Sequence, residues 1–115
     1  MPVPSQMLSI SIMSDEFQIK VIGEVLYISV NLVRLDANST ATIKKNLKLD
    51  LNPTVKRAEV DIGHVNFIDS SGVGLLLGIY RKLPMENAQV ILHNVQPCVL
   101  AVLELLRLHR VFKVE

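Results

Sequence analysis

The fold is decided by the stretch from Val60 to Gly74, VDIGHVNFIDSSGVG. Around its start, apolar residues alternate with the charged residues Glu59 and Asp61, which is the period-two pattern of a strand with one face in a core. From Val73 onward, apolar residues recur at helical spacing until a proline ends the pattern. The stretch therefore predicts a buried strand followed by a helix. The apolar stripe of this helix comprises Val73, Leu75, Leu76, Leu77, Ile79, Tyr80 and Leu83.

The junction between this strand and this helix is Asp69-Ser70-Ser71-Gly72. Aspartate and serine side chains carry oxygen acceptors that bind the first free amides of a helix, so the junction predicts an N-terminal cap. A phosphate attached here would meet free amide donors and the positive end of the helix dipole. From the residues alone, Ser70 and Ser71 are both candidate phosphorylation sites.

The flanking segments predict further strands and helices. Gly23-Glu24 indicates a tight turn between two β-rich runs, and hence a hairpin. The polar cluster at 37–40 begins one helix and Pro97 begins another. Strands that alternate with helices after a hairpin favour an α/β fold, with a mixed central sheet of about four to five strands flanked by helices. The predicted strands are 17–21, 25–30, 58–62, 89–93 and 111–114.

Apolar stripes indicate which side of the other two helices faces the core. In the helix that follows residues 37–40, three lysines fall outside the stripe and are expected to face solvent: Lys44, Lys45 and Lys48. The stripe of that helix is Ile43, Leu47 and Leu49, and the stripe of the helix that begins at Pro97 is Val99, Val102, Leu103 and Leu106.

The N-terminal end of the chain has a different character. Residues 1–16 are a polar, methionine-rich extension, in which Leu8, Ile10 and Ile12 alternate with serines and predict an additional edge strand. The remaining residues, 17–115, have the length of one compact domain with a single core.

Composition and charge exclude several classes of function. Twelve Lys and Arg residues against 11 Asp and Glu residues give a net charge of +1, which provides no field for nucleic acid or an anionic membrane. Tryptophan is absent, so a platform for stacking bases is lacking. No apolar run approaches the roughly 20 residues that span a bilayer, and the N-terminal residues lack the basic start of a secretion signal. We expect a cytoplasmic protein without direct nucleic-acid or membrane partners.

The residue patterns also argue against catalysis and metal binding. The only cysteine, Cys98, has no local motif of a nucleophile, and we interpret it as a small buried residue. His64, His93 and His109 form no metal-ligand spacing with each other or with Cys98. The sequence around Ser70 lacks the first glycine of the Gly-x-Ser-x-Gly motif of serine hydrolases. We therefore expect no enzyme activity, no metal and no cofactor.

The glycine-rich run GVGLLLG at 72–78 superficially resembles a dinucleotide-binding loop. No acidic residue ends a following strand at the spacing of that motif, and the domain is short for a paired nucleotide-binding unit. A packing role is favoured, because Ser71, Gly74 and Gly78 share one helical face and allow close approach to a neighbouring element.

The segment NFIDSSGVGL, residues 66–75, resembles the signature of anti-sigma-factor antagonists, the single-domain members of the STAS family. In that family the first serine of the Asp-Ser-Ser-Gly run is phosphorylated, which by position is Ser70, preceded here by Asp69. Leu35-Asp36-Ala37 is similar to the second half of the turn that precedes the first helix of the family. The two residues before it differ, because Val33-Arg34 stands where relatives have a glycine and an acid.

The resemblance implies a function. An antagonist of this type binds an anti-sigma-factor serine kinase and thereby frees a sigma factor, and phosphorylation of Ser70 ends the binding. The kinase supplies ATP and magnesium, a serine phosphatase restores the binding form, and the antagonist is a substrate rather than an enzyme. The residues that the resemblance implies for partner binding are Asp36, Asp69, Ser70, Ser71, Gly72, Val73 and Gly74.

Two other functions stay open from the sequence. A STAS subunit of a membrane lipid or anion transporter would use the same domain to dock on an ATPase without phosphorylation. A nucleotide-sensing domain would use the loop at Gly72 to bind GTP or ATP. Simple capping of a helix is the alternative role for Asp69 and Ser70.

Overall fold

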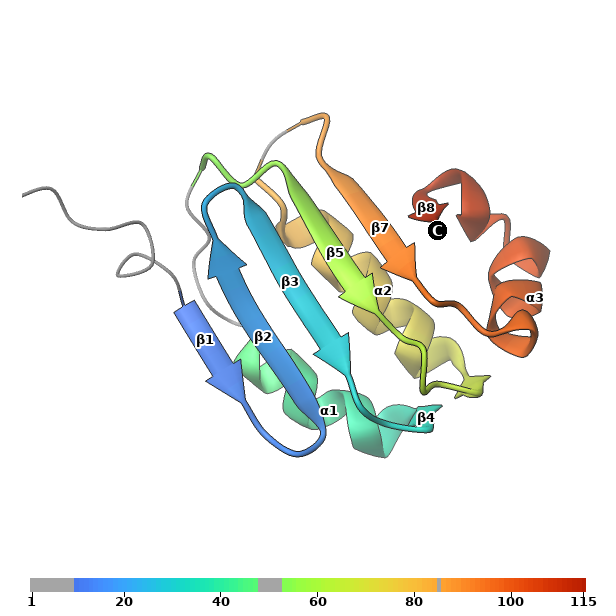
Figure 1. The fold of residues 1–115 in the computed structure, drawn as a ribbon. Helices are drawn as coiled ribbons and strands as arrows, with labels where there is room; N and C mark the ends of the chain where they lie inside the picture. Colours follow the sequence, from blue (N-terminus) through green and yellow to red (C-terminus); the bar gives the residue numbers. More distant parts are fainter. Residues whose placement is uncertain (1–9, 48–52, 85) are drawn as a thin grey trace, which may run out of the picture.

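A mixed six-stranded sheet forms the centre of the computed structural model, which describes residues 10–47, 53–84 and 86–115 (Figure 1). The first two pairs of neighbouring strands are antiparallel and the other three pairs are parallel. The predicted α/β class with a mixed sheet is confirmed, with six strands instead of four to five. The strands, in their order across the sheet, are β1 (Ile10–Met13), β2 (Phe17–Ile22), β3 (Val25–Val30), β5 (Arg57–Asp61), β7 (Gln89–His93) and β8 (Phe112–Val114).

The larger strand count comes from β1, which pairs antiparallel with β2 and forms one edge of the sheet. It lies in the segment where alternation of apolar residues and serines predicted an edge strand; Leu8 of that segment lies outside the described residues. The hairpin β2–β3 turns at Gly23, whose φ of 58° is in the left-handed region that glycine adopts without strain.

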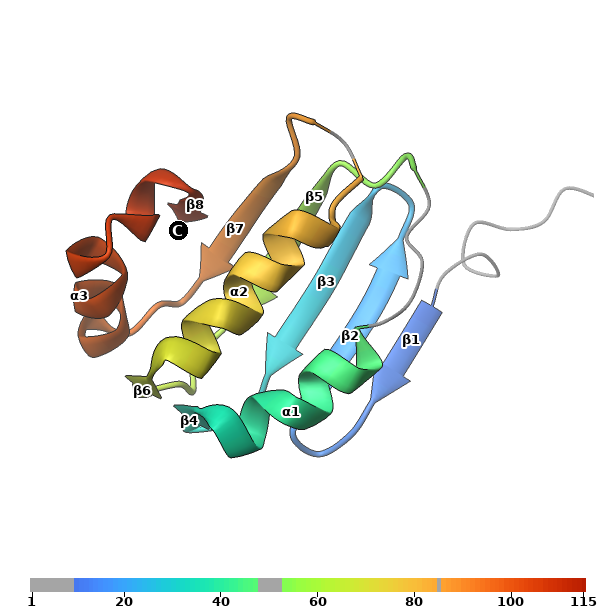
Figure 2. The same ribbon diagram turned by 180° about the vertical axis from the view of Figure 1, so that it is seen from behind.

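Two helices, α1 (Ala37–Asn46) and α2 (Ser70–Lys82), cover one face of the sheet, as the two opposite views show (Figures 1 and 2). A third helix, α3 (Pro97–Leu105), and a short 3-10 helix, η2 (Leu108–Arg110), lie toward the β8 edge. In the described part of the chain, no helix lies over the opposite face. In β2 and β5 this arrangement buries every second side chain and leaves the alternate ones half-buried or exposed, whereas three consecutive residues of β7 are buried.

The core is built from alternate strand residues and from the apolar stripe of α2. Of the predicted α2 stripe, Leu77 is half-buried and Tyr80 is 40% exposed, so the stripe is narrower than predicted. Tyr80 lies in the last turn of α2. The buried residues of that stripe are Val73, Leu75, Leu76, Ile79 and Leu83.

Two predictions around α3 are wrong. Leu106 is 52% exposed because α3 ends at Leu105 and the chain turns away through Arg107, which has a φ of 60°. Cys98 is exposed instead of buried, and its thiol donates a hydrogen bond to the carbonyl oxygen of Asn66 at 3.0 Å.

The predicted stripe of the first helix is confirmed where the structure describes it. Ile43 of α1 and Leu47, the residue that caps its C-terminal end, are buried as predicted. Lys48 and Leu49 lie outside the described residues.

A second, two-stranded sheet was not predicted from the sequence. Strands β4 (Arg34–Leu35) and β6 (Phe67–Ile68) pair in parallel, with Arg34 opposite Phe67 and Leu35 opposite Ile68. Each strand leads directly into a helix, β4 into α1 and β6 into α2 (Figure 2). The pairing therefore holds the N-terminal ends of the two helices next to each other.

Candidate functional site

The candidate site is the pair of helix starts that β4 and β6 bring together. Asp36 is the N-cap of α1 and Asp69 is the N-cap of α2. Asp36 directly follows Leu35, Asp69 directly follows Ile68, and Leu35 and Ile68 are paired in the short sheet. The Asp69 amide also donates a hydrogen bond to the Leu35 carbonyl oxygen at 3.3 Å. Two carboxylates from segments far apart in the sequence thus lie at one end of the molecule.

Asp69 caps α2 as predicted from its position. Its Oδ1 accepts hydrogen bonds from the amides of Ser71 at 2.8 Å and Gly72 at 3.2 Å. Ser70 is the first residue of α2 and is exposed, whereas Ser71 is half-buried. Of the two candidate serines, Ser70 therefore presents its side chain more openly to an incoming enzyme.

Gly72 is the glycine whose lack of a side chain the fold requires. A Cβ at this position would lie 2.5 Å from the Leu35 carbonyl oxygen and 2.6 Å from Cγ1 of Ile68, because the first turn of α2 packs on β4 and β6. Gly72 and its neighbour Val73 are both buried. They support the candidate surface from beneath, and Asp36, Asp69, Ser70, Ser71 and Gly74 keep some exposure at it.

The position of Gly72 also argues against a nucleotide-binding loop. Phosphate-binding loops offer free backbone amides to the ligand. Here the amide of Gly72 is occupied by Asp69, and its α-carbon faces the backbone of Leu35.

The start of α1 carries a more elaborate cap. Asp36 accepts from the Ser39 amide at 3.1 Å, and the Asp36 amide donates to the Ser39 hydroxyl at 2.9 Å, which forms a capping box. The Ser39 amide, and also Arg34 with its Nε 3.3 Å from Oδ2, hold the pKa of Asp36 below its ordinary value. Asp36 therefore stays ionised at neutral pH.

Arg34 and Phe67 are functional candidates that the sequence analysis did not identify. The Arg34 guanidinium lies over the Phe67 ring, 3.9 Å from its centroid, and also forms a salt bridge with Asp36. Val33, the preceding residue, is 55% exposed. Arginine and aromatic residues are enriched at protein interfaces. No local pattern predicts this contact, because it depends on the pairing of β4 with β6.

The predicted packing role of Gly74 and Gly78 is wrong. A Cβ at Gly74 would meet only Nζ of Lys44, at 4.0 Å, and a Cβ at Gly78 would meet nothing within 4 Å. Both glycines are exposed and line a groove between α1 and α2 with a volume of about 210 Å³. Its floor includes Leu47 and Leu75, and its cations are Lys44 and Lys82.

Comparison with known proteins identifies the fold. A family model described as the STAS domain matches residues 16–115. The chain belongs to the STAS family. Its fold resembles that of an anti-sigma factor antagonist, SpoIIAA in its unphosphorylated form, with 27% sequence identity, a TM-score of 0.66, and coverage of 86% of this chain and 87% of that chain.

Two further STAS-type structures are similar. The phosphorylated form of the Bacillus cell fate determinant SpoIIAA matches with 27% identity and a TM-score of 0.64, over 86% of this chain and 90% of that chain. An anti-sigma-factor antagonist domain protein from Planctomyces limnophilus matches with 19% identity and a TM-score of 0.74, over 87% and 88% of the two chains. The last likeness concerns the fold alone.

The STAS family is a family of non-enzymatic regulatory domains. Across residues 10–47, 53–84 and 86–115, no three His, Cys, Asp or Glu side chains are grouped so that they could hold a metal ion. Within the same ranges, no helix has the length and apolar character that a membrane span requires. His64 and His109 are exposed, and His93 pairs with Glu59 on the open face of the sheet.

The Asp69 cap gives a direct test of this site. Asp69→Ala is expected to lower the free energy of unfolding by about 1 to 2 kcal/mol, because two amides at the start of α2 lose their acceptor. Asp69→Asn keeps a capping oxygen, so we expect its free energy of unfolding to fall by about half of that amount or less. Urea unfolding followed by circular dichroism measures both; equal losses would show that the charge of Asp69, and not its hydrogen bonds, stabilises the helix start.

Proposed function

We propose that this STAS protein is an anti-sigma-factor antagonist whose binding to an anti-sigma-factor serine kinase is switched by phosphorylation of Ser70. The observation that carries the proposal is an exposed Ser70 at the first position of α2, beside the capping carboxylate of Asp69, in a fold like that of SpoIIAA. In this scheme the kinase supplies ATP and magnesium. A serine phosphatase restores the binding form, and the STAS domain at 17–115 acts in the cytoplasm, with residues 1–16 as an extension.

The electrostatics of the helix start supply the switch. A phosphate on Ser70 adds about −1.5 to −2 charges. The amides of Ser71 and Gly72 already bind Asp69, so the phosphate would share the helix start with an ionised carboxylate. A partner docked on this surface would have to desolvate both charges or face them with its own acids. The modification therefore weakens the complex without unfolding the domain.

The partner surface that we propose extends from this helix start along α2. Gly74 and Gly78 leave the helix backbone accessible, which lets a partner approach closely. Lys44 and Lys82 place positive charge beside the groove, and neither has an acidic partner within the described residues. We expect the complementary surface of the kinase to carry acidic and small apolar groups.

Intact-mass measurement and site mapping test this function. The full chain is incubated with ATP, magnesium and each candidate anti-sigma kinase from the same organism. We expect one added phosphate, located on Ser70, and none on Ser70→Ala. Ser71→Ala is the matched control and should be modified like the wild type.

Failure of this test has a defined meaning. If a folded chain accepts no phosphate from any of these kinases, the switch is contradicted. Copurification with an ABC-type ATPase would then support the alternative of a transporter-associated STAS subunit.

A further inference from the structure

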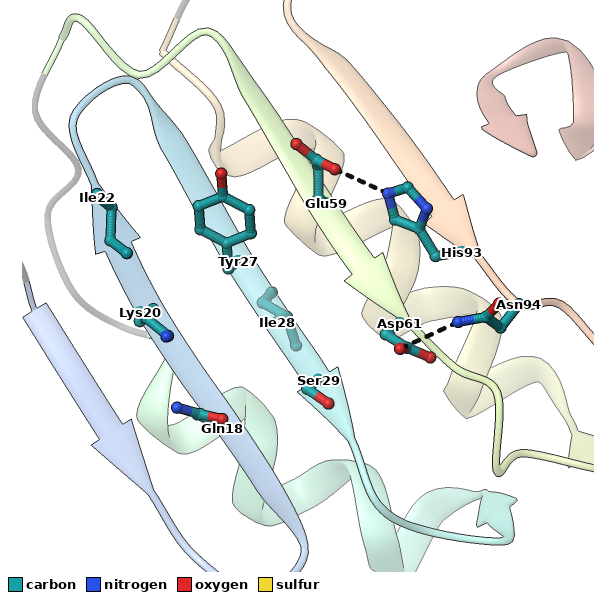
Figure 3. A pocket seen from close by; sticks show the side chains of 10 residues that line it. All are labelled: Gln18, Lys20, Ile22, Tyr27, Ile28, Ser29, Glu59, Asp61, His93 and Asn94. Atoms are coloured by element: carbon teal, nitrogen blue, oxygen red, sulfur yellow. Dashed lines mark hydrogen bonds and ion pairs between the residues drawn. The ribbon is translucent and has the colours of Figure 1, made fainter. Parts of the chain in front are cut away.

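The open face of the sheet carries a hollow that the switch at Ser70 does not use. Its volume is about 460 Å³, and its walls come from β2, β3, β5 and the end of β7 (Figure 3). This face is the one over which the described chain places no helix (Figure 1). The side chains that line it are mostly polar, although the strands that bear them form the core on their other side.

Strand register gathers these polar groups into two rows. In one row, Lys20 of β2 lies opposite Tyr27 of β3, which lies opposite Glu59 of β5. The row beside it contains three further polar residues that are paired in the same way: Gln18, Ser29 and Asp61. Side chains of alternate residues on a strand point to the same face, so both rows face the hollow. Figure 3 shows them around its walls.

The carboxylate of Glu59 already has two partners on the same face of the sheet, Arg57 and His93. Arg57 donates to its Oε2 at 3.0 Å and His93 Nε2 lies 2.8 Å from its Oε1. These hydrogen bonds, that of Arg57 first, lower the pKa of Glu59. The Glu59 carboxylate is therefore held in place by Arg57 and His93 and is not the group that we expect to bind a charged ligand.

Two opposite charges in the hollow, Asp61 and Lys20, form no salt bridge with any residue that the structure describes. Asp61 accepts hydrogen bonds from the amide of Gly63 at 2.9 Å and from Nδ2 of Asn94 at 3.2 Å, which fixes its carboxylate but leaves it further lone pairs. Because β3 separates their strands and Asp61 belongs to the neighbouring row, the backbones of Lys20 and Asp61 are about 12 Å apart.

We propose that this hollow binds a small zwitterion whose amine and carboxylate are joined by a short aliphatic chain. Lys20 binds the carboxylate, with the Gln18 amide and the Ser29 hydroxyl as further donors. Asp61 binds the ammonium group. The ring of Tyr27, which stands beside Lys20 in the hollow, contacts the methylene groups (Figure 3). A ligand with only one charge would leave either Lys20 or Asp61 without a partner.

Titration of the full-length protein with 5-aminopentanoate tests the site. Pentanoate and pentylamine, each carrying one of the two charges, are the matched controls at equal ionic strength. We expect saturable shifts of backbone amide resonances in β2, β3 and β5 with 5-aminopentanoate, and binding at least about tenfold weaker with either control. Equally tight binding of pentanoate or pentylamine would overturn the proposal, as would the absence of saturable shifts with 5-aminopentanoate.

Variants separate this site from general charge effects. Lys20→Met and Asp61→Asn are each expected to weaken binding of 5-aminopentanoate by about tenfold or more. Lys45→Met removes an exposed cation from α1, on the helix-covered side of the sheet, and should bind like the wild type. If Lys20→Met and Lys45→Met bind equally well, Lys20 is not part of a site and the proposal fails. The result does not depend on phosphorylation of Ser70.

Discussion

Gly72→Ala is expected to lower the free energy of unfolding by about 3 kcal/mol or more, because the added methyl group has no room in the packed start of α2. The added Cβ would lie 2.5 Å from the carbonyl oxygen of Leu35, which is backbone and cannot move away as a flexible side chain can. Relief requires α2 to shift away from β4 and β6, which disturbs both helix starts. Urea unfolding followed by circular dichroism measures the loss.

Gly78→Ala is the matched control for that substitution. It adds the same methyl group to the same helix, at a position where a Cβ meets nothing within 4 Å. Because alanine has a higher helix propensity than glycine, we expect the free energy of unfolding to rise by about 0.5 to 1 kcal/mol. Similar small changes at Gly72 and Gly78 would contradict the close packing of α2 on β4.

Ser70→Asp is expected to weaken binding to the cognate anti-sigma kinase by more than about a hundredfold, while the domain stays folded. A penalty of about 3 kcal/mol for desolvating a second carboxylate beside Asp69 is sufficient for this loss. Aspartate carries less charge than a phosphate, so true phosphorylation is expected to have a larger effect. Isothermal titration calorimetry with the kinase that modifies the protein measures the affinity.

Two further variants make the binding experiment decisive. Ser70→Ala cannot be phosphorylated and is expected to bind the kinase constitutively with the affinity of the unmodified wild type. Arg81→Gln makes the same change of one charge at an exposed residue in the last turn of α2 that does not line the groove, and reports how much of any loss is general electrostatics. Wild-type affinity of Ser70→Asp would show that charge at Ser70 does not control the complex.

Local patterns predicted the parts of the fold that depend on neighbours in the sequence. The hairpin around Gly23, the strand that ends at Asp61 and the cap at Asp69 all follow from residue spacing, and the structure contains each of them. The position of Ser70 at the start of α2 follows from the same cap. Its role as a phosphorylation site stays a prediction.

The features that sequence reasoning missed depend on contacts between distant segments. Arg34 stacks on Phe67 because β4 pairs with β6. Each of these strands has only two residues, which is too short to show the alternation of apolar and polar residues that predicts a strand. The exposure of Cys98, the second residue of α3, depends on how α3 is placed against the rest of the fold, which local spacing does not specify. The alternation in β5 predicted one face in a core, but it does not say whether the polar face meets the polar faces of β2 and β3 in a hollow.

The pairing of β4 with β6 has a consequence for how the protein is recognised. Asp36 and Asp69 are neighbours only while that short ladder holds, so the surface around Ser70 is a property of the folded chain and is absent from any peptide that contains Ser70 alone. An enzyme that reads this surface reads tertiary structure instead of a linear motif. Misfolded copies would then escape modification, and the switch would act only on molecules that are already competent to bind.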